Sequence, residues 1–185
     1  SKVEEILERV KRLIEENIKR SEEILEEVRR LIRENTEVSK KLLEEVKREI
    51  TELEKEVRED RDKDRLRKKV EEVKDKIRKE LKRNEDHSRR VAEEIRRLLR
   101  ENERHSKRVA DEVDRVLKEL DKTTKDERVK DVLRRLKKIV DESKRRSDKV
   151  NKEIEDRVRE SEKKSRKVNE DIKRLVKRVA DEVER

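Results

Sequence analysis

The sequence predicts an all-α protein: an elongated, nearly straight, up-down-up antiparallel three-helix bundle. Three observations carry this prediction. The 185 residues include no Gly and no Pro, the apolar residues recur at helical spacing in three segments, and each segment repeats itself every 18 residues. Eighteen residues make five turns of an ideal helix, so the apolar stripe stays on one face without supercoiling. We expect a single domain over 1–185, with helices over 2–58, 64–120 and 125–185.

The first helix carries its apolar residues on one face. Placed at 100° per residue, its stripe covers about 140°, the pattern of a helix that is buried on one side and solvated on the other. Ser1 with Glu4 has the spacing of a capping box, which would begin the helix. The three repeats of this segment span 4–21, 22–39 and 40–57.

The second and third helices show the same period and begin after polar breaks near 59–64 and 121–125. Asp and Thr favour helix N-termini because their side-chain oxygens accept from free backbone N–H groups. We expect Asp62 or Asp64 to cap the second helix, and Thr124 with Glu127 to form a capping box for the third. Short connections make consecutive helices antiparallel neighbours. The repeats span 67–84, 85–102 and 103–120, then 123–140, 141–158 and 159–176.

All six Asn, both His and every Ser except Ser1 fall on these apolar stripes. With each helix measured from its midpoint, and the second helix running in reverse, the polar positions meet at two heights about 27 Å apart. We name them level 1 and level 2. Level 1 consists of Asn17, Ser21, Asn102, His105, Ser106, Ser143, Ser147 and Asn151; level 2 consists of Asn35, Ser39, Asn84, His87, Ser88, Ser161, Ser165 and Asn169.

Each level is predicted to be a hydrogen-bond network across the three helices. A buried polar atom without a partner costs about 1–3 kcal/mol, so such a network is tolerated only if nearly every member is paired. A helix that slipped or flipped would place these groups against Leu and Val. The expected role of the two levels is therefore structural: they specify the helix register.

Catalytic, metal and cofactor sites are not expected. His87 and His105 lie about 27 Å apart on one helix, and the stripes hold no carboxylate or thiolate that could complete a metal site. A Ser–His pair near His105 would have no carboxylate to orient the imidazole and no Gly-rich loop for an oxyanion hole. We therefore predict no enzyme activity and no cofactor.

The surface composition argues against nucleic-acid and membrane partners. The net charge of +9 comes from 61 basic and 52 acidic residues that are interspersed, and aromatic residues that could stack on bases are absent. No apolar run approaches the ~18 residues of a membrane span, and packing uses the apolar stripes that a membrane surface would need. We expect no specific nucleic acid and no membrane as partner.

The sequence resembles computationally designed helical bundles with buried hydrogen-bond networks. The resemblance covers the whole chain. It rests on the straight 18-residue repeat, on the absence of Gly and aromatic residues, and on Asn, Ser and His layers between Leu, Ile and Val layers. It implies a synthetic protein without a native location. The chain begins at Ser1 without Met, which suggests a processed recombinant product, expressed in soluble form in the host cytoplasm.

Two functional interpretations follow. In the first, the chain is a designed monomeric scaffold that requires no partner and whose networks fix register. In the second, it is the three-helix subunit of a designed four-helix heterodimer and binds a separate amphipathic helix. Two features keep this alternative open. Each polar level is large for a three-helix core, and the surplus positive charge would suit an acidic partner.

Overall fold

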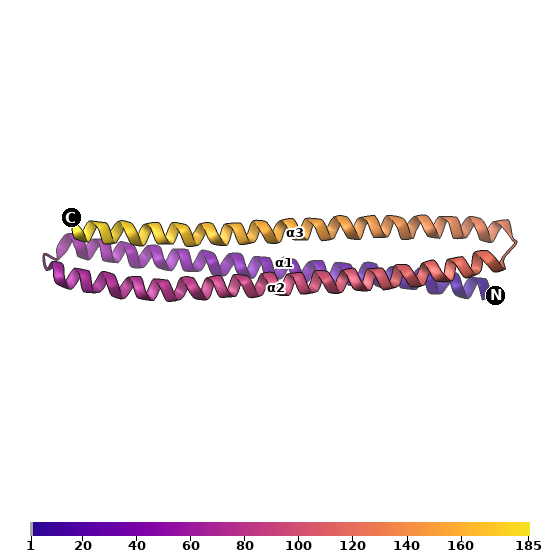
Figure 1. The fold of residues 1–185 in the computed structure, drawn as a ribbon, viewed down its shortest axis with the longest axis horizontal. Coiled ribbons are helices and arrows are strands. Elements are labelled where there is room, and N and C mark those ends of the chain that lie inside the picture. Colours follow the sequence, from indigo (N-terminus) through magenta and orange to yellow (C-terminus); the bar gives the residue numbers. More distant parts are fainter. Residues whose placement is uncertain (1) are drawn as a thin grey trace. The chain divides into compact units, whose positions relative to one another are not determined.

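The computed structural model describes residues 2–185 and contains three long helices, labelled in Figure 1. They are α1 (Lys2–Glu59), α2 (Lys63–Thr123) and α3 (Glu127–Glu184). No strand occurs among the described residues, so the predicted all-α class is confirmed. The first helix begins at the predicted residue, and the other helix ends differ from the predicted ones by one to three residues. Ser1, and with it the predicted Ser1–Glu4 capping box, lies outside the described residues.

Asp62, one of the two predicted candidates, caps the start of α2. Its side-chain Oδ1 accepts a hydrogen bond from the backbone N–H of Arg65 at 3.3 Å, and its carbonyl accepts from Leu66 N–H at 3.1 Å. Asp60 Oδ1 accepts in turn from the N–H of Asp62 at 3.0 Å. In this short loop, two Asp side chains satisfy backbone donors that the helix start exposes.

Asp126, and not the predicted Thr124, caps α3. Asp126 Oδ1 accepts from Arg128 N–H at 3.0 Å, and its carbonyl accepts from Lys130 N–H at 3.1 Å. Thr124 Oγ1 instead accepts from Asp126 N–H at 3.3 Å, one step before the helix. The start of α3 moves accordingly to Glu127. Meanwhile α2 continues past Leu120 to Thr123, whose hydroxyl donates to the carbonyls of Glu119 and Leu120.

The residues group into two compact units, and each unit contains a segment of all three helices. Unit 1 comprises the described residues up to Arg29 together with Ile95–Arg157, and unit 2 comprises Arg30–Glu94 and Val158–Arg185. The single domain expected over 1–185 stays a prediction, and the two units are described separately below.

Unit 1 is an antiparallel arrangement around an aliphatic core. Asn17 pairs with Ser106 and Ser21 with Asn102, so residue numbers rise along α1 while they fall along α2. The core is built mainly by Val, Ile and Leu, with Ala110 as a smaller member. One buried cluster of this core consists of Val10, Ile14, Val109, Val113, Leu117, Leu120, Leu133 and Val140.

Unit 2 repeats the antiparallel order around its own aliphatic core. Ser39 pairs with Asn84 and Asn35 with Ser88, and α3 joins through Asn84–Asn169. Three consecutive helices with alternating direction give the predicted up-down-up topology. One buried cluster of this unit consists of Leu42, Val46, Ile50, Leu53, Leu66, Val70, Ile77, Leu81, Ile172, Val179 and Val183.

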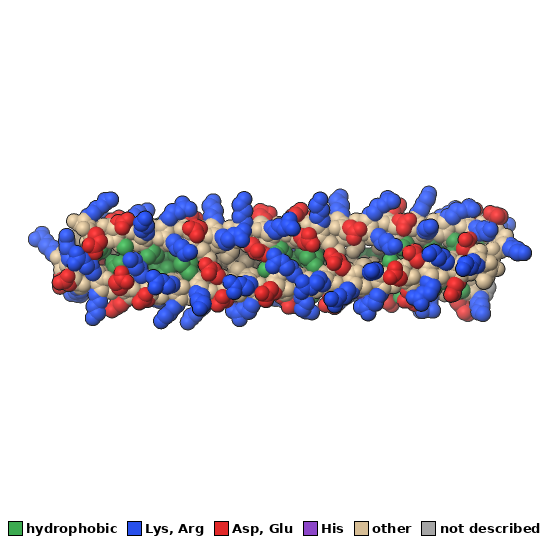
Figure 2. Space-filling view, viewed as in Figure 1, with side chains coloured by type: hydrophobic (Ala, Val, Ile, Leu, Met, Phe, Trp, Pro, Cys, Tyr) green, Lys and Arg blue, Asp and Glu red, His purple; other side chains and the backbone are tan. Residues whose placement is uncertain are grey.

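The surface is densely charged with both signs. Figure 2 shows Lys and Arg side chains alternating with Asp and Glu over the visible face, with apolar side chains in the furrows between them. Ion pairs link neighbouring helices within each unit, such as Arg9–Glu112 in unit 1 and Arg178–Glu54 in unit 2. Exposed pairs of this kind contribute about 0–1 kcal/mol each, so packing of the apolar stripes dominates. None of the described helices has an apolar stretch long enough to cross a membrane.

Candidate functional site

The buried polar side chains are the most unusual chemical feature of the molecule. Burial of an amide without a partner is unfavourable, so these residues mark the places where the sequence departs from a simple aliphatic core. All six Asn are among them, and every member belongs to one of the two predicted levels. The buried polar residues are Asn17, Asn35, Ser39, Asn84, Ser88, Asn102, Asn151, Ser165 and Asn169.

In level 2, Ser88 on α2 joins the other two helices. Its Oγ donates to Asn35 Oδ1 on α1 at 2.9 Å and lies 2.9 Å from Ser165 Oγ on α3. Asn35 Nδ2 donates in turn to Ser161 Oγ at 3.3 Å. Four side chains from three helices therefore form one hydrogen-bonded chain.

A second chain in level 2 passes through Asn84. Ser39 Oγ on α1 donates to Asn84 Oδ1 at 3.2 Å, and Asn84 Nδ2 donates to Asn169 Oδ1 on α3 at 3.2 Å. Asn169 Nδ2 completes the chain by donating to Glu85 Oε1 at 3.2 Å. Glu85 is an exposed residue of α2 that the stripe pattern does not include. The sequence feature that could have indicated Glu85 is its position next to Asn84. Every charged residue beside a stripe residue has the same feature, so it does not distinguish Glu85.

Level 1 makes three of the same contacts in unit 1. Ser21 Oγ donates to Asn102 Oδ1 at 3.0 Å, and Asn102 Nδ2 donates to Asn151 Oδ1 at 3.3 Å. Ser106 Oγ donates to Asn17 Oδ1 at 3.1 Å. Each of these bonds has a counterpart in level 2 between residues that lie one 18-residue repeat away. These equivalent sequence positions therefore make equivalent contacts in both units.

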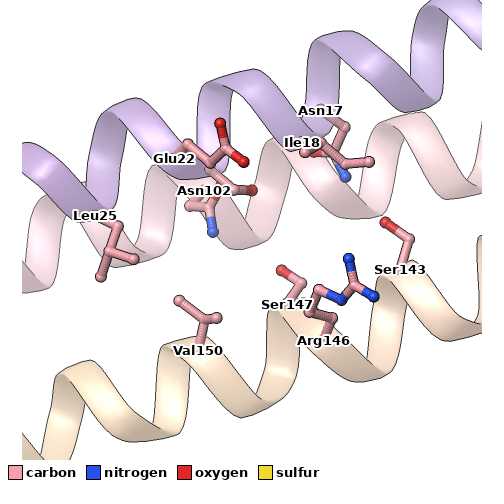
Figure 3. A pocket seen from close by; sticks show the side chains of 10 residues that line it. Asn17, Ile18, Glu22, Leu25, Asn102, Ser143, Arg146, Ser147 and Val150 are labelled. Carbon is pink, nitrogen blue, oxygen red and sulfur yellow. The ribbon is translucent and has the colours of Figure 1, made fainter.

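Level 1 differs from level 2 along α3. Within the described residues, Ser143 and Ser147 make no side-chain hydrogen bond, although their repeat equivalents Ser161 and Ser165 do. A cavity of about 110 Å³ occupies this place, lined by Asn17, Ser21, Asn102, Ser143 and Ser147 together with apolar residues (Figure 3). In unit 1, the hydroxyls of α3 thus face open space and not the amides across from them.

The two histidines lie at the margins of the levels. Both are half-buried. His87 Nε2 is buried and has no hydrogen-bond partner, and no side-chain bond joins His105 to another described residue. Their participation in the networks stays a prediction. Among residues 2–185, no cluster of three or more His, Asp or Glu side chains has the arrangement of a metal site.

Among the carboxyl groups of residues 2–185, Glu80 in unit 2 alone has a clear electrostatic perturbation. Burial raises the pKa of Glu80, and the negative charge of Glu49 raises this pKa further, while Lys76 opposes the rise. The Oε2 atom of Glu80 is buried and unpartnered. The carboxylate lies outside both polar levels and destabilises the fold slightly in its charged form.

The arrangement as a whole can donate and accept hydrogen bonds, but its core groups are neutral amides and hydroxyls. It defines a class of protein: an antiparallel three-helix bundle with Asn and Ser side chains hydrogen-bonded across its core. No family model and no curated protein sequence matches the chain. Its fold is similar to a solved structure described as "Computationally designed three helix bundle", with a TM-score of 0.56 and 20% sequence identity over 99% of this chain and 86% of that one.

Proposed function

We propose that the chain is a designed structural scaffold in which levels 1 and 2 specify the register and direction of the helices. The observation that carries the proposal is the pair of bonded chains in level 2, which connect three helices through Ser88 and Asn84. A one-turn shift of any helix would separate these partners and bury their amides against aliphatic side chains, at about 1–3 kcal/mol for each group. The resemblance to a designed bundle supports the synthetic origin.

The test replaces every member of level 2 with Leu or Val in the full chain. Such cores usually keep or gain thermal stability, because hydrophobic residues of similar volume replace buried polar groups well. We expect an unchanged or higher Tm together with a loss of uniqueness, seen as multiple sets of methyl signals in NMR spectra. A matched variant that replaces Val46, Ile50, Ile77 and Ile172 with other aliphatic residues controls for altered packing of the aliphatic core. A single set of signals for the level 2 variant would contradict the proposed role.

A second function, that of a module that binds an amphipathic helix, is favoured by the seam between α1 and α3. Most hydrogen bonds between level residues join α2 to α1 or to α3. In the described residues, Asn35–Ser161 is the one bond between level residues that joins α1 to α3. Ile18 on α1 and Ile139 on α3, both in unit 1, are 38% and 47% exposed. In a ring of four helices, the added helix would lie between the first and the third.

Light scattering on the isolated chain after size-exclusion chromatography separates the two functions. A monomer of 22.7 kDa that does not bind a hydrophobic dye is expected for the scaffold, whose apolar stripes are covered. A helix-binding module without its partner leaves apolar surface open, so it would self-associate or bind the dye. Either of these results would favour the second function over the first.

A further inference from the structure

We propose that the level 1 cavity between α1 and α3 is a binding site for a small neutral molecule that carries an amide or two hydroxyl groups. The two levels provide an internal comparison for this inference. They contain the same residue types at positions 18 apart, yet in level 2 the α3 hydroxyls of Ser161 and Ser165 bond to Asn35 and Ser88. In level 1 the equivalent hydroxyls line a cavity.

Asn17 is a buried residue, 8% exposed, whose side-chain amide is only partly used in hydrogen bonding. Oδ1 accepts from Ser106, but within the described structure Nδ2 donates to no residue, whereas the equivalent Nδ2 of Asn35 donates to Ser161. Figure 3 shows the nitrogen of Asn17 on the side of Ser143, where both residues line the cavity. A ligand oxygen at this point would accept the unused N–H.

The remaining walls define the chemical class of the ligand. Ile18, Leu25 and Val150 form an apolar side that suits a methyl or short alkyl group. Glu22 and Arg146 also line the cavity and carry opposite charges, so the site offers no net charge to bind an ion. The hydroxyls of Ser143 and Ser147 can both donate and accept. A neutral molecule with a polar end and an apolar end matches this lining.

The size of the cavity limits the ligand to a few atoms. A dry apolar cavity of about 150 Å³ takes up benzene, which has six heavy atoms. By that measure, the space of about 110 Å³ beside Asn17 accommodates four or five heavy atoms, as in acetamide or propane-1,2-diol. Ordered water is the competing occupant, and a ligand that reproduces its hydrogen bonds displaces it without loss.

The experiment uses the full chain, labelled with nitrogen-15, and follows the side-chain NH₂ signals of Asn17 and Asn35 during titration with acetamide. We expect a saturable shift at Asn17 and none at Asn35, whose hydrogen-bond partners are already in place. Propane-1,2-diol should compete with acetamide for the same shift. Equal shifts at both residues, or a linear and non-saturating shift at Asn17, would overturn the proposal, because they indicate non-specific solvation.

Variants that fill the cavity provide the matched control. Ser147→Leu should abolish the saturable shift at Asn17, and Ser143→Val should weaken it, because neither replaced hydroxyl makes a bond that the fold would lose. Circular dichroism verifies that both variants stay helical, and the second serves if the first does not fold. Xenon is the apolar probe. Saturable xenon binding at Asn17 without an acetamide response would show a purely apolar cavity and would overturn the proposed ligand class.

Discussion

Individual Asn residues connect the helices because an amide is both donor and acceptor. Asn84 and Asn102 each accept from a Ser on α1 and donate to an Asn on α3, so one side chain on α2 links all three helices. A carboxylate at the same place could accept in both directions but could not donate. In level 2 a hydroxyl also joins three helices, since Ser88 bonds to Asn35 and Ser165.

His87 contrasts with these Asn residues, since its Nε2 is buried without a partner. Replacing it with Leu removes an unsatisfied polar atom and keeps an apolar contact surface of similar size. We expect His87→Leu to raise the free energy of unfolding by about 1 kcal/mol, at the lower end of the cost of such an atom because the residue is half-buried. Urea denaturation measures this value. The control is His105→Leu, whose ring nitrogens are not among the buried unpartnered atoms and which should change stability less. If His87→Leu instead lowered the free energy of unfolding, the imidazole would make a hydrogen bond in solution that the structure does not contain.

Glu80 gives a pH dependence with a defined sign. Burial and the nearby Glu49 raise the pKa of Glu80 in the folded protein above its usual value of 4.5. The folded state therefore binds this proton more tightly than the unfolded state, and the associated stability is present at acid pH and is lost as the pH rises through the folded pKa. Glu80→Gln should stabilise the protein at pH 7 by about 0.5 kcal/mol or less and have no effect near pH 4. The exposed Glu93 supplies a control variant, Glu93→Gln. Equal effects of the two substitutions at pH 7 would contradict this assignment.

Whole helices were predictable from the sequence because their determinants are periodic and redundant. Many stripe residues indicate each helix, so the prediction does not depend on any single residue. The helix ends depend on single side chains: Asp126 caps α3 although Thr124 has the better capping-box spacing with Glu127. The capping-box spacing does not determine whether Thr124 or Asp126 bonds to the free N–H groups. The bond of Asn169 to Glu85 was missed for a similar reason, because a long exposed side chain can fold back toward a buried amide.

The cap of α3 can be tested by comparing the two candidates. Asp126→Ala removes the acceptor for the N–H of Arg128 and should lower the free energy of unfolding by about 1 kcal/mol. Thr124→Ala removes only the acceptor for Asp126 N–H within the loop and should cost clearly less. Chemical denaturation of both variants measures the difference. A larger effect of Thr124→Ala would restore the capping box that the sequence suggests.

At the scale of the molecule, two levels with the same polar residue types differ in structure. The 18-residue repeat places the same Asn, Ser and His types in both levels, and the pattern alone predicts the same closure for each. In the structure, six of the eight level 2 members are buried, but only Asn17, Asn102 and Asn151 are buried in level 1. In unit 1 the difference coincides with the cavity beside Ser143 and Ser147, and such closure depends on the packing of many aliphatic side chains. A repeat pattern contains no information about that packing.

This inequality predicts different local stability in the two units. Asn84 and Asn102 are matched for fraying, because each lies 21 residues from its end of α2. In level 2 the α3 side chains are hydrogen-bonded, whereas in level 1 Ser143 and Ser147 of α3 border a cavity, which removes packing contacts and makes local opening less costly. We expect the backbone amides around Asn84 and Asn169 to exchange with deuterium more slowly than those around Asn102 and Asn151. Hydrogen exchange followed by NMR measures the four sites in one sample. Filling the cavity with Ser147→Leu should slow exchange around Asn151 toward the rate at Asn169 and leave Asn84 unchanged. Equal protection at both levels in the unmodified chain would mean that unit 1 closes in solution as fully as unit 2.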